Sequence, residues 1–214
     1  MYSPSIQNLI SSFKNLPSIG QRTAERFVFY LLKSGKKEVT ELMLALKELI
    51  ETVKSCEVCW NFADTSPCQI CQDKKRDHTT ICVITDPQDL MVIERTGEYK
   101  GVYHVLRGLL DAGDEESLRR IKVNELVGRL SPSYQPASSV GGEGAHGGVA
   151  EVILALNPDL AGETTMLYLE KEIKKNNPSI KVSRLARGLP MGADLRYADD
   201  ITLGSAIKNR IAKG

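Results

Sequence analysis

The sequence has no apolar stretch long enough to cross a bilayer, and its first residues lack the features of a secretory signal. Residues 1–5, Met-Tyr-Ser-Pro-Ser, have neither a basic start nor an apolar run. There is also no Gly-x-x-x-x-Gly-Lys-Ser/Thr loop, no Gly-x-Gly-x-x-Gly directly after a predicted strand and no Gly-x-Ser-x-Gly elbow. We therefore expect a cytoplasmic protein, and nucleotide hydrolysis has no support in the sequence.

An excess of charge of either sign is absent as well. The chain has 28 Lys and Arg against 27 Asp and Glu, a net charge of +1. Such a balance gives no overall attraction to nucleic acid or to an anionic membrane, so any attraction of this kind must be local. With 214 residues, of which 42% are hydrophobic, the chain is long enough for one ordinary domain and a smaller part.

Cysteine is scarce, but four of the five cysteines form two Cys-x-x-Cys pairs, Cys56 with Cys59 and Cys68 with Cys71. Two such pairs close around one tetrahedral ion, and four thiolates are the ligand set of a structural zinc ion. We therefore predict a Zn²⁺ site at these four residues. Because the segment between the pairs is too short to build a core, metal ligation would supply its folding free energy.

Two other interpretations of the paired cysteines are weaker. Disulfides are disfavoured in a reducing cytoplasm, and a thioredoxin-like redox site is disfavoured because neither pair follows a predicted strand and opens a helix. The fifth cysteine, Cys82, lies within Ile-Cys-Val-Ile at 81–84, and we expect it to be a buried core thiol.

Apolar residues at helical spacing run through residues 5–54 and predict three helices. Ile6 and Ile10 belong to the stripe of the first helix. The second helix starts near Gln21 and stops at Gly35, a natural C-cap. The third helix carries an apolar stripe that we expect to face inward. This stripe comprises Leu42, Met43, Leu46, Leu49, Ile50 and Val53.

A Leu-Pro-Ser-Ile-Gly segment at 16–20 separates the first two helices. The arrangement resembles a helix-hairpin-helix DNA-binding motif, in which backbone N–H groups at a helix start face a phosphate. Arg22 and Arg26 follow one helical turn apart, which strengthens the case for phosphate contact. Ser18 stands where the motif usually has glycine, so the arginines would carry more of the binding. The alternative is an ordinary solvated helix face.

From residue 80 onward, short apolar runs alternate with helical segments. We predict strands over 81–85, 102–106, 149–156 and 180–186, and helices over 87–95, 123–130 and 163–176. Asp86 and Pro87 are typical of an N-cap followed by the first helical residue. The alternation indicates a parallel, right-handed α/β sheet with helices on its faces.

Two later segments are irregular. Residues 131–148 are rich in glycine and serine and indicate a flexible loop, in which we expect His146 to be exposed rather than a ligand. Residues 186–195 form a second loop, and a short helical pair at 197–200 and 203–211 closes the chain.

The order of these parts resembles the bacterial recombination mediator family RecR, over nearly the whole chain. The resemblance is carried by 16–20 with Arg22 and Arg26, the four paired cysteines, 81–84 with Pro87 and Asp89, 151–158, 162–163, 186–190, and 197–199 with Thr202 and Leu203.

The resemblance implies a multi-part α+β fold. The expected parts are a helix-hairpin-helix region at 1–54, a four-cysteine zinc finger at 55–79, an α/β Toprim domain with a parallel sheet at 80–178, and a C-terminal strand, loop and helical segment at 179–214.

The resemblance also implies a function. Members of this family are mediators of recombinational DNA repair that are not enzymes. They bind DNA without sequence specificity as a clamp, and act with RecO and RecF to promote RecA loading on SSB-coated single strands at gaps. The implied assemblies are dimers or ring-like tetramers around duplex or gapped DNA, in a cytoplasmic protein that is nucleoid-associated on DNA. Arg22 and Arg26 fall on the family's DNA contacts, and Cys56, Cys59, Cys68 and Cys71 on its zinc ligands.

An enzyme is the main alternative, because catalytic Toprim domains hold magnesium with a glutamate after the first strand and an Asp-x-Asp pair after a later one. This chain has Thr85 at the glutamate position, and Asn157-Pro158-Asp159 keeps one carboxylate of the pair. Glu163 could contribute, but it begins a helix. A magnesium-dependent nuclease or primase-like enzyme is therefore disfavoured. A zinc-stabilised interaction module without DNA contact is a third hypothesis.

Overall fold

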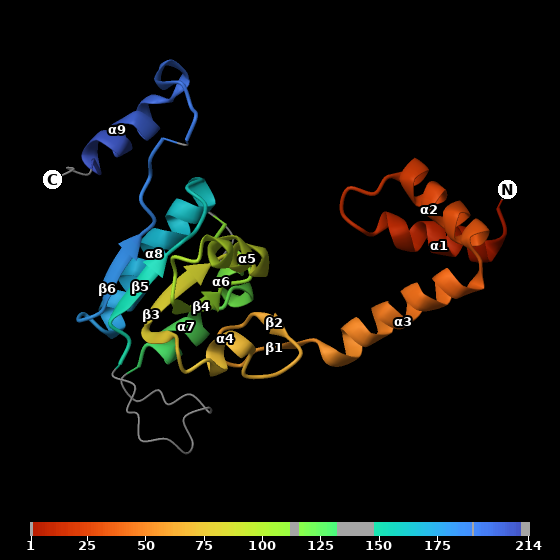
Figure 1. Ribbon diagram of the computed structural model, residues 1–214, viewed down its shortest axis with the longest axis horizontal. Helices are drawn as coiled ribbons and strands as arrows, with labels where there is room; N and C mark the ends of the chain where they lie inside the picture. Colours follow the sequence, from red (N-terminus) through yellow and green to blue (C-terminus); the bar gives the residue numbers. More distant parts are fainter. Residues whose placement is uncertain (1, 112–115, 132–147, 190, 211–214) are drawn as a thin grey trace. The chain divides into compact units, whose positions relative to one another are not determined.

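The computed structural model describes residues 2–111, 116–131, 148–189 and 191–210 (Figure 1). The chain divides into two compact units, Met1–Val53 and Lys54–Gly214. The first unit is helical, and the second contains a small cysteine-rich finger and a four-stranded sheet. Over the described ranges, no helix combines the length and the apolar character needed to cross a membrane.

The N-terminal unit consists of the three predicted helices, α1 (Pro4–Lys14), α2 (Gln21–Ser34) and α3 (Lys36–Thr52). Ile10 of α1 is buried against Ala24 and Val28 of α2, which places the small core of this unit between these two helices. Gly35 ends α2 with a φ of 90°, a backbone conformation that favours glycine. The predicted helix end at Gly35 is therefore confirmed.

The prediction that the apolar stripe of α3 faces inward is wrong for the single chain. No residue of α3 is buried, and the exposure of the stripe residues Leu42 to Ile50 lies between 42% and 81%. The physical reason is that α1 and α2 bury their apolar faces against each other, while α3 continues beyond them within this unit (Figure 1). The predicted helix is confirmed, but within the described part of its own unit nothing buries the stripe.

The second unit begins with the cysteine-rich finger. Strands β1 (Lys54–Ser55) and β2 (Phe62–Ala63) pair antiparallel, and a short helix α4 (Gln69–Gln72) follows. The two Cys-x-x-Cys pairs lie in this segment, one after β1 and the other at the start of α4.

The sheet contains four parallel strands in the order β4-β3-β5-β6, which confirms the predicted α/β arrangement. The strands are β3 (Asp77–Ile84), β4 (Gly101–Val105), β5 (Glu151–Leu154) and β6 (Lys181–Arg184). The helices are α5 (Pro87–Thr96), α6 (Ser117–Arg120), α7 (Val123–Arg129), α8 (Leu160–Asn176) and α9 (Asp200–Lys208), with a 3₁₀ turn at Leu195–Tyr197.

Alternate residues of β3 divide the core of this unit between the two faces of the sheet. Ile81 and Val83 pack in the larger cluster, which includes apolar residues of α7 and α8. Cys82 and Ile84 face the opposite side, where Leu90 of α5 covers them. Cys82 is buried as predicted, and burial raises the pKa of its thiol to about 12. It is a core residue and not a reactive thiolate.

The ends of two helices follow from their sequences. The Asp86 N–H donates to Asp89 Oδ2 at 3.0 Å in a capping box at the start of α5, and Gly97 ends the helix in the left-handed conformation. Helix α8 begins earlier than predicted, because Asp159 caps it and its Oδ1 accepts from the Gly162 N–H at 2.7 Å. The loop predicted at 131–148 and His146 lie almost entirely outside the described residues, apart from 131 and 148.

The first turn of α8 requires glycine at position 162. A Cβ atom there would lie 1.9 Å from the Asn157 carbonyl oxygen, so the backbone of this turn packs directly on the loop after β5. We expect Gly162→Ala to destabilise the protein by about 3 kcal/mol, because the clash involves backbone on both sides. Gly128→Ala is the matched control in α7: nothing lies within 4 Å of its added Cβ. This control should stabilise the protein by about 0.5–1 kcal/mol. Urea unfolding of both variants measures the difference, and equal midpoints would contradict it.

Candidate functional site

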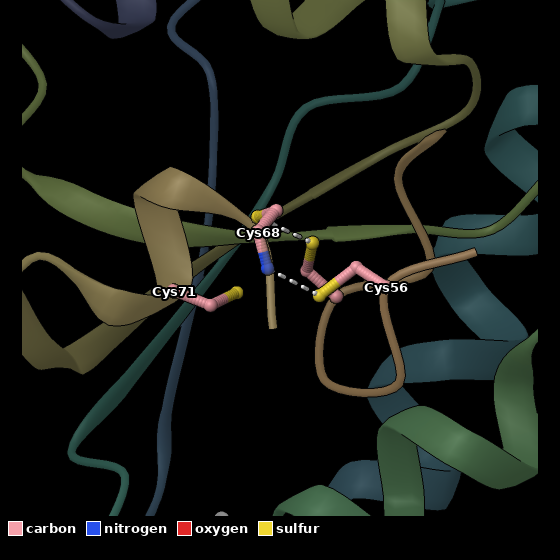
Figure 2. Close-up of side chains that lie close together, drawn as sticks. Cys56, Cys68 and Cys71 are labelled. Atoms are coloured by element: carbon pink, nitrogen blue, oxygen red, sulfur yellow. Dashed lines mark hydrogen bonds between the residues drawn. The ribbon is translucent and has the colours of Figure 1, made fainter. Parts of the chain in front are cut away.

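The four paired cysteines meet in one cluster. Their sulfur atoms all lie within 4.8 Å of one another, and all four side chains are buried. Figure 2 shows Cys56 reaching this point from the loop after β1, and Cys68 and Cys71 from the start of α4, with their sulfur atoms directed toward one another. The structure thus brings together the residues that spacing alone predicted.

The dimensions of the cluster fit a tetrahedral zinc ion. The Cys59 and Cys68 sulfur atoms are 3.6 Å apart, and the Cys68 N–H donates to Cys56 Sγ at 3.3 Å. Four sulfur atoms at the usual Zn–S bond length of about 2.3 Å would lie about 3.8 Å from one another. The backbone N–H at Cys68 supplies the kind of hydrogen bond that orients a thiolate ligand.

Proximity of the thiols also favours a cation. Hydrogen bonds from the thiols of Cys59, Cys68 and Cys71 hold the pKa of Cys56 far below its ordinary value. Hydrogen bonds to Cys56 and the other two thiols, together with burial, raise the pKa of Cys71. Four close thiols therefore do not ionise independently, because negative charge on one opposes ionisation of the next. A divalent ion reverses that balance, since a coordinated thiol is deprotonated outright.

The hairpin at 16–20 opens α2 without a side-chain cap. Gly20 is the N-cap residue, and in the described part of the chain no side-chain cap accepts a hydrogen bond from the first N–H groups of the helix. A helix start of this kind presents unpaired N–H groups and the positive end of the helix dipole. Ser18 lies in the left-handed region with a φ of 63°, which explains why glycine suits this position in the motif.

Arg22 and Arg26 lie on the exposed surface of α2, just beyond the hairpin. Among the described residues, neither guanidinium forms an ion pair, and Arg26 lies 5.8 Å from the ring centroid of Phe27. The nearby acid Glu25 accepts a 2.6 Å hydrogen bond from the Gln21 amide. The two arginines are therefore free to contact an external anion.

The carboxyl edge of the sheet is where the enzyme hypothesis requires magnesium ligands. Thr85 directly follows β3, and its Oγ1 is buried and without a hydrogen-bond partner among the described residues. Asn157 is exposed, and the Asp159 carboxylate is engaged in capping α8. A threonine and an amide do not supply the negative charge that magnesium needs from its protein ligands.

Glu163 also lies at this edge and is paired with two arginines. Its Oε2 lies 3.1 Å from Arg184 Nη1, and its Oε1 contacts Arg187 Nη2. Arg184 also reaches Glu170 Oε2 at 3.1 Å. Sequence reasoning did not assign roles to these arginines. Their only signal was their position, with Arg184 inside the predicted strand 180–186 and Arg187 just after it.

These side chains line a cavity of about 1010 Å³ at the carboxyl ends of β5 and β6. Asn157 and Glu163 come from the β5 side, Arg184 and Arg187 from the β6 side, and Thr202 from α9. Ligands of parallel α/β sheets bind at this edge. Among the described residues that line the cavity, Glu163 is paired with arginine and Asp199 caps α9, which differs from a site with several free carboxylates.

Family comparisons match the parts of the chain in order. Residues 6–50 match the RecR helix-hairpin-helix, 53–73 the RecR zinc finger domain with four cysteine ligands, 79–186 the Toprim domain and 188–211 the RecR C-terminal family. The zinc finger match contains all four clustered cysteines, so the metal centre is of the four-cysteine zinc type.

Relatives named "Recombination protein RecR" are similar over their full length. The protein from Bifidobacterium adolescentis is 44% identical over 211 residues, covering 99% of this chain and 98% of the relative. The one from Thermobifida fusca is 42% identical over 212 residues, with 99% and 98% coverage. The one from Moorella thermoacetica is 41% identical over 211 residues, with 98% coverage of both.

The metal centre yields a direct test. Cys68→Ser should release zinc, because the variant loses a thiolate ligand and a hydroxyl is a poor substitute for it. The segment around Trp60 should loosen as the ligation that folds it is lost. Zinc analysis of reduced protein and the fluorescence of the single tryptophan measure both effects. Cys82→Ser is the control and should retain zinc, since Cys82 lies outside the cluster. Less than about half an equivalent of zinc in the parent protein would contradict the site itself.

Proposed function

The chain belongs to the RecR family, and from this we propose that it is a mediator of recombinational DNA repair that acts as a DNA-binding clamp. The observation that carries the proposal is the exposed, unpaired pair Arg22 and Arg26 beside the uncapped start of α2. This arrangement occurs within the segment that matches the family's helix-hairpin-helix.

We propose that DNA binding is directed at the phosphate backbone. The two guanidinium groups project from successive turns of α2, so they could engage neighbouring phosphates of one strand. N–H groups at the helix start would add donors to the same anion. None of these groups reads a base, so binding would be independent of sequence. A near-neutral chain of net charge +1 fits this local attraction, which involves only one surface.

In this proposal, several copies of the chain assemble to form the clamp around DNA. The apolar stripe of α3 is exposed over Leu42, Met43, Leu46, Leu49 and Ile50, and a long apolar helix face of this kind is typical of an interface. We propose that copies of the chain bury it in a dimer or a ring-like tetramer around duplex or gapped DNA. Repetition of the phosphate contact in each copy would turn modest single-site affinity into firm retention.

The proposal extends to partners and location. It assigns RecO and RecF as protein partners and places the clamp at gaps, where it promotes RecA loading on SSB-coated single strands. The protein would be cytoplasmic, and nucleoid-associated when on DNA. These assignments rest on membership of the family.

Cys56, Cys59, Cys68 and Cys71 are the zinc ligands in this proposal. Four protein ligands complete a tetrahedral shell, so no position remains for water or substrate. The ion would stabilise the finger and take no part in a reaction.

We also propose that the Toprim domain has no catalytic activity. Thr85 and Asn157 are uncharged, Asp159 caps a helix, and Glu163 is neutralised by arginine. Phosphodiester cleavage by two metal ions needs several free carboxylates in one place. These four residues therefore do not supply the ligand set that the enzyme hypothesis requires.

A nuclease assay tests the absence of catalysis. Labelled gapped DNA incubated with the protein and magnesium or manganese should remain intact, because the edge does not bind a metal pair. Cleavage by the parent protein that disappears in Glu163→Gln would overturn the proposal and support the enzyme hypothesis. Gel analysis of the labelled strands gives the measurement.

Charge reversal tests the DNA interface. The double variant Arg22→Glu, Arg26→Glu should bind all DNA sequences more weakly than the parent protein. Its plot of log affinity against log salt should flatten by about 2 for each protomer in contact, since each phosphate contact contributes about 0.9 to the slope. Zinc content and thermal unfolding should stay near the parental values, because both side chains are exposed.

The control carries the same change of charge on α8. Lys171→Glu with Lys175→Glu alters two exposed lysines, and it should reduce DNA binding far less. Equal salt dependence of the parent and the arginine variant, on both duplex and gapped DNA, would refute the interface. That result would favour the zinc-stabilised interaction module without DNA contact.

A further inference from the structure

One side chain of the sheet domain reaches into the zinc finger. Arg107 lies two residues after the end of β4, and its Nε donates to the Trp60 carbonyl at 2.9 Å. Its Nη2 donates to Ser55 Oγ at 2.9 Å, and its guanidinium lies 4.1 Å from the ring centroid of Phe62. Arg107 thus contacts β1, β2 and the residue that follows Cys59, which together surround the first cysteine pair.

Backbone hydrogen bonds connect the same two parts. The Val105 N–H, at the end of β4, donates to the carbonyl of the ligand Cys59 at 2.8 Å. The next two N–H groups donate to the end of β3 and the residue after it. The Leu106 N–H donates to the Ile84 carbonyl and the Arg107 N–H to the Thr85 carbonyl, both at 2.9 Å. The ends of β3 and β4 and the first cysteine knuckle therefore form one continuous set of hydrogen bonds.

Both sides of this contact have unusual backbone conformations. Trp60 and Arg107 have φ values of 63° and 62°, in the left-handed region that residues with a Cβ avoid. Such conformations persist where surrounding contacts hold them. Here the Arg107 side chain bonds to the carbonyl of Trp60, so each unusual residue is held through the other.

Apolar and charged contacts reinforce the connection. Ile70, between the second pair of cysteines, packs against both the cysteine cluster and the core under α5. Lys122 Nζ lies 4.2 Å from the ring centroid of Trp60, so a second cation lies beside this part of the finger. Four thiolates around a divalent ion leave a formal charge of −2, and the half-buried Arg107 places positive charge next to it.

We infer that Arg107 is a positioning residue that couples the zinc centre to the carboxyl edge of the sheet. The metal holds the turn at Cys56–Cys59 in place, so that the Cys59 carbonyl accepts a hydrogen bond from the Val105 N–H. Arg107 holds the same turn through its hydrogen bonds to Trp60 and Ser55. Loss of the metal then loosens the ends of β3 and β4, beside Thr85. The inference rests on the zinc assignment of the proposed function and is independent of DNA binding.

Zinc release tests the coupling in the full-length, zinc-loaded chain. Arg107→Met keeps the length and apolar stem of the side chain but removes its donors and its charge. We expect zinc transfer to an excess of chelator to be about tenfold faster than in the parent, as loss of two hydrogen bonds and a cation–π contact predicts. Arg107→Lys should be intermediate, because it keeps the charge but not the two-pronged hydrogen bonding. Arg119→Met, which removes an exposed arginine of α6, should match the parent.

Amide hydrogen exchange distinguishes the coupling from a general loss of packing, because the coupling predicts faster exchange only near the end of β4. Removing zinc from the parent should accelerate exchange in peptides that cover 101–107, while peptides of α8 stay protected. Arg107→Met with zinc bound should show the same local change. Release from Arg107→Met within about twofold of Arg119→Met would overturn the inference, and so would unchanged exchange at 101–107 in the zinc-free parent.

Milder variants keep the test decisive if Arg107→Met does not fold. Phe62→Leu and Ser55→Ala each remove one contact of Arg107, and Phe62 is already 53% exposed. Each should speed zinc release about threefold, and unchanged release in both would overturn the inference. Zinc content and DNA binding of the parent are measured in the same preparation. A failure of the zinc assignment or of the DNA-binding proposal is then seen separately from a failure of the coupling between Arg107 and the zinc centre.

Discussion

Four cysteine thiols within 4.8 Å of one another are the constraint on which the second unit of this protein depends. The finger that carries them has two strands of two residues each and a helix of four residues, too little to hold a fold by burial alone. Ligation closes the finger, and the closed finger then presents Ile70 and the Cys59 carbonyl to the sheet. Through these contacts, the metal centre helps to define where β4 ends.

The carboxyl edge of the sheet combines a cavity with paired charges. In place of a cluster of free acids, Glu163 is held by Arg184 and Arg187 at the mouth of a cavity. Arg184, the last residue of β6, is held by ion pairs with Glu163 and Glu170 of α8. In the proposed function the sheet serves as a scaffold, and DNA binding and self-assembly are assigned to the start of α2 and the face of α3.

Local signals in the sequence predicted most of the architecture. Asp86, Pro87 and Gly97 marked both ends of α5, and the cysteine spacing located the metal centre, because each depends only on neighbouring residues. The pairing of Glu163 with Arg184 could not be predicted, since it joins residues that only the folded sheet brings together. The stripe of α3 was found but assigned the wrong environment. Helical spacing shows that a face is apolar and says nothing about whether its partner is in the same chain.

Self-assembly through the apolar stripe of α3 would make the stability of the protein depend on its concentration. If copies of α3 cover one another, the leucines that are exposed in a single protomer become buried in the assembly. Their burial then adds to the free energy of unfolding only when a second copy is present. A tenfold fall in protein concentration would then cost a dimer about 1.4 kcal/mol of apparent stability. Newly made chains would pass through a stage in which this helix is exposed to chaperones and proteases, and the level of synthesis would set how long that stage lasts.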